Sequence, residues 1–412
     1  MIVFENMIQR GHEQVTFFSD PHSGLKVIIA IHNTTLGPAL GGCRMWQYTN
    51  EAEALVDVLR LSKGMTYKAA ISGLNLGGGK AVIIGNSKKD KSEILFRTFG
   101  RFVEGLGGRY ITAEDVGTSV KDMEWVRTET KHVTGISRAL GGSGDPSVVT
   151  AYGVYIGMKA AVKSKLNRSS LDGLKIGIQG LGHVGMFLVE YLSKDGAEIF
   201  VTDIDTNLID KAVKDFGVKA VSVEDIYSLD IDVFAPCALG AILNDTTIPL
   251  LKCSIIAGGA NNQLENSHKH GKDLMAKGIL VSPDYVINAG GLINVSNELE
   301  GYNRERAFNQ AEGIYDTLMA IFKRSKEADI PTNIASDYLA EERIRMLSEL
   351  KSIYTSKSTV SEKERLGEYS TKTSKAEQEL NKCNNNFKIL YSITFIIIFI
   401  ILNLFSFKLY LN

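Results

Sequence analysis

Cysteine is scarce in this sequence: the 412 residues include four cysteines, and no two of them form a CxxC pair. Such wide spacing argues against both a disulfide framework and a zinc site, and it fits a reducing compartment such as the cytoplasm. The histidines include the pair His268 and His270. An HxH pair in a polar loop is more often solvated than bound to a metal, so we predict no metal ion.

An excess of charge of one sign is also missing, because 46 lysines and arginines balance 47 aspartates and glutamates. Balanced charge gives no broad electrostatic footprint for nucleic acid, so we expect a small-molecule partner and no nucleic acid. The N-terminus lacks the basic and then apolar order of a secretory signal. The length suffices for two domains and a large core.

The stretch Lys63–Ile84 combines two lysines with a run of glycines. Lys68 lies near the end of a predicted helix, and Lys80 follows Gly77-Gly78-Gly79, just before a predicted strand, AVII. Glycines let a ligand approach the backbone closely, which would put Lys80 at the mouth of a pocket. Two ammonium groups in a partly dry site disfavour each other's charged forms, so one lysine can be a base near neutral pH while the other stays a cation. The alternative is two ordinary surface lysines.

A carboxylate follows the next predicted strand. The segment ITAEDVGT, residues 111–118, reads as a short strand that ends in Glu114 and Asp115. Proteins of the α/β class place their chemistry at such strand ends, so Asp115 is a candidate acid-base group.

The segment LKIGIQGLGHVG predicts a dinucleotide-binding turn. A strand leads into Gly180-Leu181-Gly182-His183-Val184-Gly185, a helix follows, and the next strand ends at Asp203. The first glycine allows a tight turn, the second lets a pyrophosphate reach the backbone, and the third lets helix and strand pack closely. Asp203 can accept hydrogen bonds from ribose hydroxyls, whereas a 2′-phosphate would meet Asp203 and Asp205 with no arginine nearby. We therefore expect NAD rather than NADP; a purely structural glycine turn is the alternative.

Strands and helices alternate along most of the chain, which predicts the α/β class. We expect an N-terminal α/β substrate-binding and oligomerisation domain over residues 1–147, completed by residues 325–354. A Rossmann-like doubly wound dinucleotide-binding domain is expected over residues 148–324, with a glycine-rich hinge at 135–146 and a cleft between the domains. In this second domain VINAGG, residues 286–291, is expected to lead from a strand into a helix.

The composition changes after about residue 354. Residues 355–387 are rich in Ser, Thr, Lys, Glu and Asn, which is typical of a flexible linker. A hydrophobic tail, 388–412, follows, and its residues 389–407 carry no charge, a length at the short end for a bilayer span. A membrane tether on the cytoplasmic face and an extension that arises from a gene-model error are the two interpretations, and the sequence does not separate them.

Three segments together resemble the glutamate, leucine, phenylalanine and valine dehydrogenases: TLGPALGGCRM at 35–45, LGGGK at 76–80 and GRYITAEDVGT at 108–118. The resemblance implies that Lys68 holds the α-carboxylate of an amino acid, that Lys80 activates water, and that Asp115 shuttles protons to and from the amino nitrogen. It places three polar residues near the nicotinamide and ribose, namely Thr150, Asn261 and Asn288. It also implies a homo-oligomer, with an octamer built through the first domain as one form.

Substrate choice follows from two positions of the same motifs. Glutamate-specific members of the family carry a lysine before the GG of GGxR and a serine after NAGG, and both contact the distal carboxylate. Leu40, which precedes Gly41, and Val295 stand at these positions here, and neither can pair with a buried carboxylate. With Ala113 and Leu292 they would form an apolar sleeve, although plain core packing is the alternative.

The expected activity is therefore the NAD-dependent, reversible oxidative deamination of L-leucine and other branched-chain amino acids to 2-oxo acids and ammonia. Two further interpretations stay open. One is a member of the family that prefers phenylalanine or valine, and the other is a catalytically silent NAD-binding adaptor at a membrane.

Overall fold

The computed structural model describes residues 3–354. The predicted linker, 355–387, and the hydrophobic segment, 389–407, lie outside the described residues. Between residues 3 and 354, none of the helices has the length and apolar character that a membrane span requires.

The first sheet has five strands in the order β1-β2-β4-β3-β5. Strands β1, β2 and β4 pair antiparallel, whereas β3 pairs parallel with both β4 and β5. The elements of this part of the chain are α1 (Val3–Arg10), β1 (Gln14–Asp20), β2 (Leu25–Asn33), β3 (Ala39–Trp46), α2 (Glu51–Ile71), β4 (Gly77–Ile84), α3 (Glu93–Glu104), β5 (Tyr110–Glu114), α4 (Val120–Arg127) and the 3-10 turn η1 (Arg138–Leu140).

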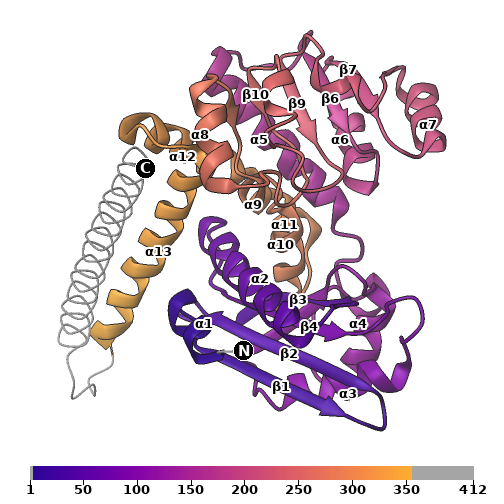
Figure 1. Ribbon diagram of the computed structural model, residues 1–412, viewed down its shortest axis with the longest axis vertical. Coiled ribbons are helices and arrows are strands. Elements are labelled where there is room, and N and C mark those ends of the chain that lie inside the picture. The colour runs from indigo at the N-terminus through magenta and orange to yellow at the C-terminus, as the bar shows by residue number, and fades with distance from the viewer. Residues whose placement is uncertain (1–2, 355–412) are drawn as a thin grey trace, which may run out of the picture. The chain divides into compact units, whose positions relative to one another are not determined.

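The helix α2 lies along one face of this sheet (Figure 1), and its apolar residues pack on Ile28, Ala30 and Val82. The opposite face, which includes Val27, Ile29 and Ala81, packs on residues of α3 and α4. Side chains alternate between the faces of a strand, so Lys80 shares the α2 face with Val82. The side-chain oxygen of Asn50 accepts a hydrogen bond from the backbone N–H of Glu53 and caps the start of α2.

The glycine run that was expected to precede a strand is itself part of the strand, because β4 begins at Gly77. A Cβ on Gly78 would lie 2.0 Å from the backbone nitrogen of Thr66 in α2, and one on Gly79 would lie 2.7 Å from the ring of Tyr110. Glycine is needed at 78 because α2 packs directly on the strand backbone, and at 79 because the ring of Tyr110 in β5 lies against it. Lys80 is therefore held inside a paired strand, and its side chain is 6% exposed.

The second sheet is parallel, with the order β11-β10-β9-β6-β7-β8. The strand order reverses between β6 and β9, and ligands of such sheets bind outside the carboxyl ends of the strands at this point. Its elements are α5 (Ser147–Leu166), β6 (Lys175–Gln179), α6 (His183–Lys194), β7 (Glu198–Thr202), α7 (Thr206–Phe216), β8 (Lys219–Ala220), η2 (Asp225–Tyr227), β9 (Val233–Pro236), η3 (Ile248–Leu250), β10 (Ile255–Ile256), α8 (Ser267–Ala276) and β11 (Leu280–Val281).

The segment around NAGG is helical, so the strand predicted at its start is wrong. Val286 and Ile287 belong to a short helix and pack in the core with residues of α5. A short apolar run fits a buried helix as well as a buried strand. The remaining elements are α9 (Asp284–Ile287), α10 (Gly290–Ser296), η4 (Asn297–Glu300), α11 (Arg304–Glu312), α12 (Ile314–Ala328) and α13 (Thr332–Tyr354).

Residues of α13 contact the end of α2. The guanidinium of Arg343 donates hydrogen bonds to the carbonyl oxygens of Ala70, Gly73 and Leu74. The hydroxyl of Tyr67 also donates to Glu341 at 2.5 Å. These contacts link α13 to the first sheet through α2, whereas the domain boundaries given above stay predictions.

Candidate active site

Lys80 and Asp115 form an ion pair on the α2 face of the first sheet. The Lys80 Nζ lies 3.0 Å from Oδ2 of Asp115, which directly follows β5. Gly42 of β3 makes this approach possible, since a Cβ there would lie 2.8 Å from Cβ of Asp115. Burial raises the pKa of Asp115, but the charges of Lys80 and Arg44 outweigh it and hold the pKa below its usual value.

Lys68 lies in the last turn of α2. Its Nζ donates a hydrogen bond of 2.6 Å to Oδ1 of Asn288, whose amide nitrogen donates in turn to Oδ1 of Asn261 at 2.7 Å. Burial lowers the pKa of Lys68 to about 8, Asp284 opposes the change, and the nearby Lys80 adds to it. The lysine whose pKa is lowered towards neutral pH is thus Lys68, the predicted ligand of the substrate carboxylate, whereas Lys80 forms an ion pair with Asp115.

Two charged residues beside the ion pair of Lys80 and Asp115 were not predicted from the sequence. Arg44, in β3, donates from Nε to Oδ2 of Asp115 at 3.1 Å and from Nη1 to Oδ2 of Asp57 at 3.0 Å. Asp57, in α2, also accepts hydrogen bonds from Tyr48 and Arg60. Two sequence signals could have indicated these residues. Arg44 is the arginine of the GGxR motif, and Asp57 lies on the same face of the predicted helix as Lys68.

Three of the four residues predicted for the sleeve lie in one apolar cluster: Leu40, Leu292 and Val295. They are 1%, 6% and 8% exposed. Ala113 is also buried, on β5, but it is not a member of this cluster. The cluster adds residues of α2 and β5 that the sequence did not single out, among them Met65, Ala69 and Ile111. Gly41 packs so closely that a Cβ there would lie 1.7 Å from the carbonyl oxygen of Gly79.

The turn between β6 and α6 has the features that a bound pyrophosphate requires. Gly180 has φ +101°, and a Cβ on it would lie 2.7 Å from Ala238. A Cβ on Gly185 would lie 2.0 Å from the carbonyl oxygen of Gly180, so helix and strand need this glycine. Apart from Gly182 itself and its two neighbours in the chain, no atom of the described residues lies within 4 Å of a Cβ added to Gly182, which leaves room for a phosphate at the helix N-terminus. These three positions therefore fit a dinucleotide.

The other predicted cofactor residues surround this turn or lie near Lys68. Asp203 follows β7, and its Oδ2 accepts the backbone N–H of Leu181 at 2.5 Å. His183 starts α6, and its Nδ1 lies 2.9 Å from Oδ2 of Asp145. Val184 packs in the core of this part of the chain. The hydroxyl of Thr150 donates to the carbonyl oxygen of Pro146 at 2.9 Å.

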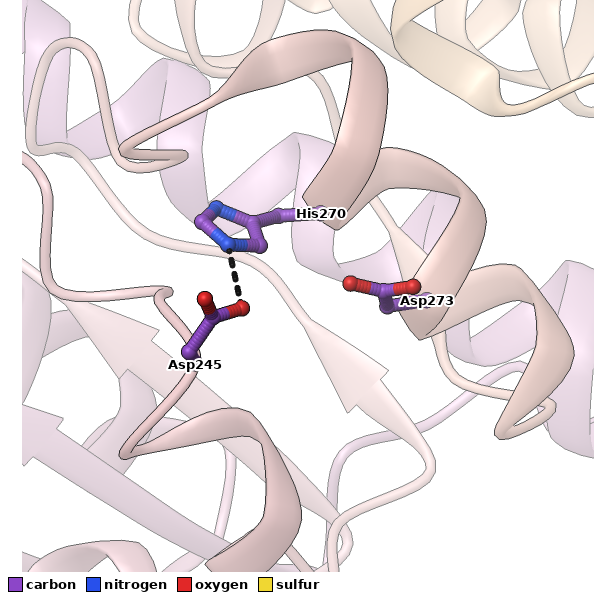
Figure 2. Close-up of side chains that lie close together, drawn as sticks. All are labelled: Asp245, His270 and Asp273. Atoms are coloured by element: carbon purple, nitrogen blue, oxygen red, sulfur yellow. Dashed lines mark hydrogen bonds and ion pairs between the residues drawn. The ribbon is translucent and has the colours of Figure 1, made fainter. Parts of the chain in front are cut away.

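Figure 2 shows a second polar cluster, made of Asp245, His270 and Asp273. The expectation that both histidines of the HxH pair are solvated is wrong for His270, which is 1% exposed. Its Nδ1 accepts the backbone N–H of Asn266 at 3.0 Å, so the neutral ring carries its proton on Nε2 and donates to Asp245 at 3.1 Å. A metal would need the lone pair of Nε2. The cluster therefore works as a polar contact that holds the loop at Asp245 to α8, with Lys269 on the same carboxylate.

Comparison with known families covers nearly the whole described chain. Residues 12–132 match the model of the Glu/Leu/Phe/Val dehydrogenase dimerisation domain, and residues 141–213 and 201–337 match the Glutamate/Leucine/Phenylalanine/Valine dehydrogenase model. The chain belongs to the Glu/Leu/Phe/Val dehydrogenase family. As a member of this family it is an amino-acid dehydrogenase that uses a nicotinamide cofactor.

Individual members of the Glu/Leu/Phe/Val dehydrogenase family resemble the chain over nearly their full length. A leucine dehydrogenase from Thermoactinomyces intermedius is 55% identical over 354 residues, which are 86% of this chain and 96% of the relative. A phenylalanine dehydrogenase from Caldalkalibacillus thermarum is 49% identical, over 84% of this chain and 94% of the relative. The crystal structure of L-tryptophan dehydrogenase from Nostoc punctiforme matches with a TM-score of 0.77 at 50% identity, over 84% of this chain and 99% of that one.

Proposed function

We propose that the chain catalyses the NAD-dependent, reversible oxidative deamination of L-leucine and other branched-chain amino acids to 2-oxo acids and ammonia. The observation that carries the proposal is the convergence of three charged groups beside an apolar cluster. Lys68, Lys80 and Asp115 supply the charges, and the cluster around Leu40 and Val295 supplies the apolar surface. Two observations argue against a catalytically silent adaptor. The chain belongs to a family of dehydrogenases, and it retains all three charged residues, Lys68, Lys80 and Asp115.

The chemistry divides among these side chains as follows. Lys68 exchanges its hydrogen bond to Asn288 for an ion pair with the substrate α-carboxylate. The turn with Gly180, Gly182 and Gly185 would hold NAD, which when bound would supply the hydride acceptor for the substrate α-carbon. Asp115 takes a proton from the amino group. Lys80 in its neutral form, after its own proton has passed to solvent, takes a proton from the water that adds to the α-carbon of the imine. Asp115 then returns its proton to the nitrogen while the hydroxyl proton of the carbinolamine passes to solvent, so that the C–N bond breaks, ammonia leaves and the 2-oxo acid remains.

The apolar cluster determines which amino acid is accepted. A glutamate side chain would bring a carboxylate against Leu40, Leu292 and Val295, and an unpaired buried carboxylate costs several kcal/mol. A branched aliphatic side chain instead gains roughly 1 to 3 kcal/mol for each methylene that it buries.

The direct test is NAD reduction by the full chain with leucine, isoleucine, valine, phenylalanine, tryptophan and glutamate offered separately. We expect the highest kcat/KM with a branched aliphatic substrate and at least about 100-fold less with glutamate. Preferred turnover of phenylalanine or tryptophan would place the specificity with the aromatic relatives. Efficient turnover of glutamate would refute the role of the apolar cluster.

Cofactor choice gives a separate prediction. The carboxylate of Asp203 would lie at the ribose, and the neighbouring Ile204 is 93% exposed and offers no cation to a 2′-phosphate. We expect kcat/KM to be at least about 100-fold higher with NAD than with NADP. The double substitution Asp203→Ser with Ile204→Arg should raise kcat/KM with NADP, whereas Ile204→Ala alone should not. Equal use of both cofactors by the unmodified enzyme would contradict this assignment.

We also propose that the chain forms a homo-oligomer through its first domain. The family model that matches residues 12–132 describes a dimerisation domain, which supports the proposal. Phe4 and Ile8 of α1 are 76% and 74% exposed, so this helix has apolar surface available for a second subunit.

A further inference from the structure

Asp115 receives two cations on one oxygen. Lys80 Nζ and Arg44 Nε lie 3.0 and 3.1 Å from its Oδ2, which leaves Oδ1 outside both contacts. The two cations come from neighbouring strands, β4 and β3. Two contacts from different directions fix the plane of a carboxylate, whereas one ammonium alone would leave it free to rotate.

Arg44 is itself fixed from the other side. Its Nη1 donates to Oδ2 of Asp57, which also accepts the hydroxyl of Tyr48 at 2.7 Å, while Nη2 of Arg60 donates to Asp57 Oδ1 at 2.8 Å. The side chains of Arg44 and Asp57 are 21% and 16% exposed, so the contact between them is largely shielded from water, whereas the side chain of Arg60 is 48% exposed. A planar guanidinium suits this place because two separate nitrogens, Nε and Nη1, reach the two carboxylates in a fixed geometry, whereas a lysine would have to serve both from a single nitrogen.

We propose that Arg44, held by Asp57, is a positioning residue that fixes the Asp115 carboxylate beside Lys80 and leaves Oδ1 to exchange the proton of the substrate amino group. The proposal rests on the proposed amino-acid dehydrogenase function. Arg44 touches neither the substrate nor the cofactor in this scheme. It acts by aiming the carboxylate and by keeping it ionised.

The charges around Asp115 predict the effect of removing Arg44 on the pH dependence. Burial alone would raise the pKa of Asp115, and Lys80 and Arg44 together hold it below its usual value. Without Arg44 the pKa of this carboxyl therefore rises, and the acid limb of the kcat profile moves to higher pH. The other titratable groups that interact with the charge of Asp115 stay in place; they are Cys43 on β3, Tyr48 after it, Lys68 on α2, and Tyr110 and Glu114 on β5.

The experiment compares Arg44→Met with Arg44→Lys, and uses Arg60→Met as the matched control because Arg60 contacts Asp57 but not Asp115. We expect Arg44→Met to lower kcat with leucine about 100-fold and to move the acid limb up by about one pH unit. Arg44→Lys should recover part of kcat, and Arg60→Met should change kcat less than about threefold. An unshifted acid limb with kcat within threefold of the unmodified enzyme would overturn the proposal.

A crystal structure of Arg44→Met gives a readout that does not depend on activity. We expect the Asp115 carboxylate to rotate away from its contact with Lys80, by about 1 Å or more at Oδ2. If Arg44→Met does not fold, Asp57→Asn, which keeps the shape of the side chain, should produce the same rotation and a smaller shift of the acid limb. An Asp115 that stays in place would refute the positioning role. Absence of turnover in the unmodified enzyme, with the rotation observed, would refute the proposed function alone.

Discussion

Replacing Lys80 by alanine is expected to reduce kcat with leucine by about 1000-fold or more, while NAD binding and the fold are retained. The side chain is 6% exposed and contacts the carboxylate of Asp115, so no other described side chain can take its place beside that group without moving. General base catalysis by one positioned group contributes about 100- to 10,000-fold, and removal of the ammonium also removes a charge next to the reacting atoms.

The fold should survive this change because the backbone of β4 stays paired with β2 and β3. Asp115 also keeps its hydrogen bond from Arg44 and is not left as an unpaired buried charge. Circular dichroism and NAD binding check this point. Lys323→Ala is the matched control, since Lys323 lies on the surface of α12 with its side chain 75% exposed.

Rescue by a small amine sharpens the test. Alanine at position 80 leaves a space beside Asp115 that methylammonium can enter, so added methylamine should restore part of kcat. It should have no such effect on the unmodified enzyme or on Lys323→Ala. A Lys80→Ala enzyme with unchanged kcat would show that the mechanism is wrong even if the fold and the substrate preference are as proposed.

The sequence alone predicted the elements whose signals are local. The short strand expected in the segment 111–118 is present as β5, which ends at Glu114, one residue before Asp115. The start of β4 could not be found in this way, because a run of glycines is locally typical of a loop. It becomes a strand because β2 and β3 pair with it and α2 packs on it, and these contacts join segments far apart in the sequence.

The sequence predicted those residues of the candidate site that belong to a recognisable motif. It did not predict residues whose role depends on a contact between distant segments. Recognisable sequence motifs contain Lys68, Lys80 and Asp115. The catalytic roles of these residues stay predictions. The contact between Arg44 and Asp57 depends on the position of α2 over β3, which no local pattern encodes. His270 was predicted to be solvated because its neighbours in the sequence are polar. It lies instead in helix α8, where its ring is buried.

Acidification is expected to destabilise the folded chain through a pair of buried histidines, His12 and His32. Each is 8% exposed, and their rings meet edge to face with centroids 4.8 Å apart. Burial lowers the pKa of each ring to about 4; for His12 the charges of Arg10 and Lys63 add to this, and for His32 those of His12 and Lys63 do. Both rings are therefore neutral in the folded state at neutral pH.

The direction of the effect follows from proton binding. Each histidine has its ordinary pKa of 6.5 in the unfolded chain and about 4 in the folded one, so between these values the unfolded chain binds more protons. Stability is complete above pH 6.5 and falls as the pH is lowered towards 4. One histidine accounts for about 3 kcal/mol over this window. Urea unfolding at fixed protein concentration, measured at several pH values from 7.5 to 4.5, gives the slope.

Substitution distinguishes the effect of this histidine pair on stability from the effect of carboxylates that also titrate at acid pH. His12→Gln keeps an N–H that can donate to the carbonyl oxygen of Leu59, as Nε2 of His12 does at 3.0 Å, and it removes the titration. It should flatten the dependence between pH 6.5 and 5, whereas the exposed His22→Gln should leave it unchanged. An equally steep loss of stability in His12→Gln and in His32→Gln would assign the acid sensitivity to other groups.

The position of the pair connects this instability to the active site. His12 contacts Ser62 at 2.9 Å and His32 contacts Thr66 at 2.8 Å, and both partners lie on α2 within the two turns that precede Lys68. A second proton on His32 would turn Nδ1, which can accept the hydroxyl of Thr66, into a donor, so this contact with α2 would be lost. A second proton on His12 would lie on Nδ1, which has no hydrogen-bond partner among the described residues, so it would bring an unpaired charge into the same packed interface. Activity should therefore fall at acid pH before global unfolding is complete, through a higher KM for the amino acid, and His12→Gln should delay that rise relative to His22→Gln.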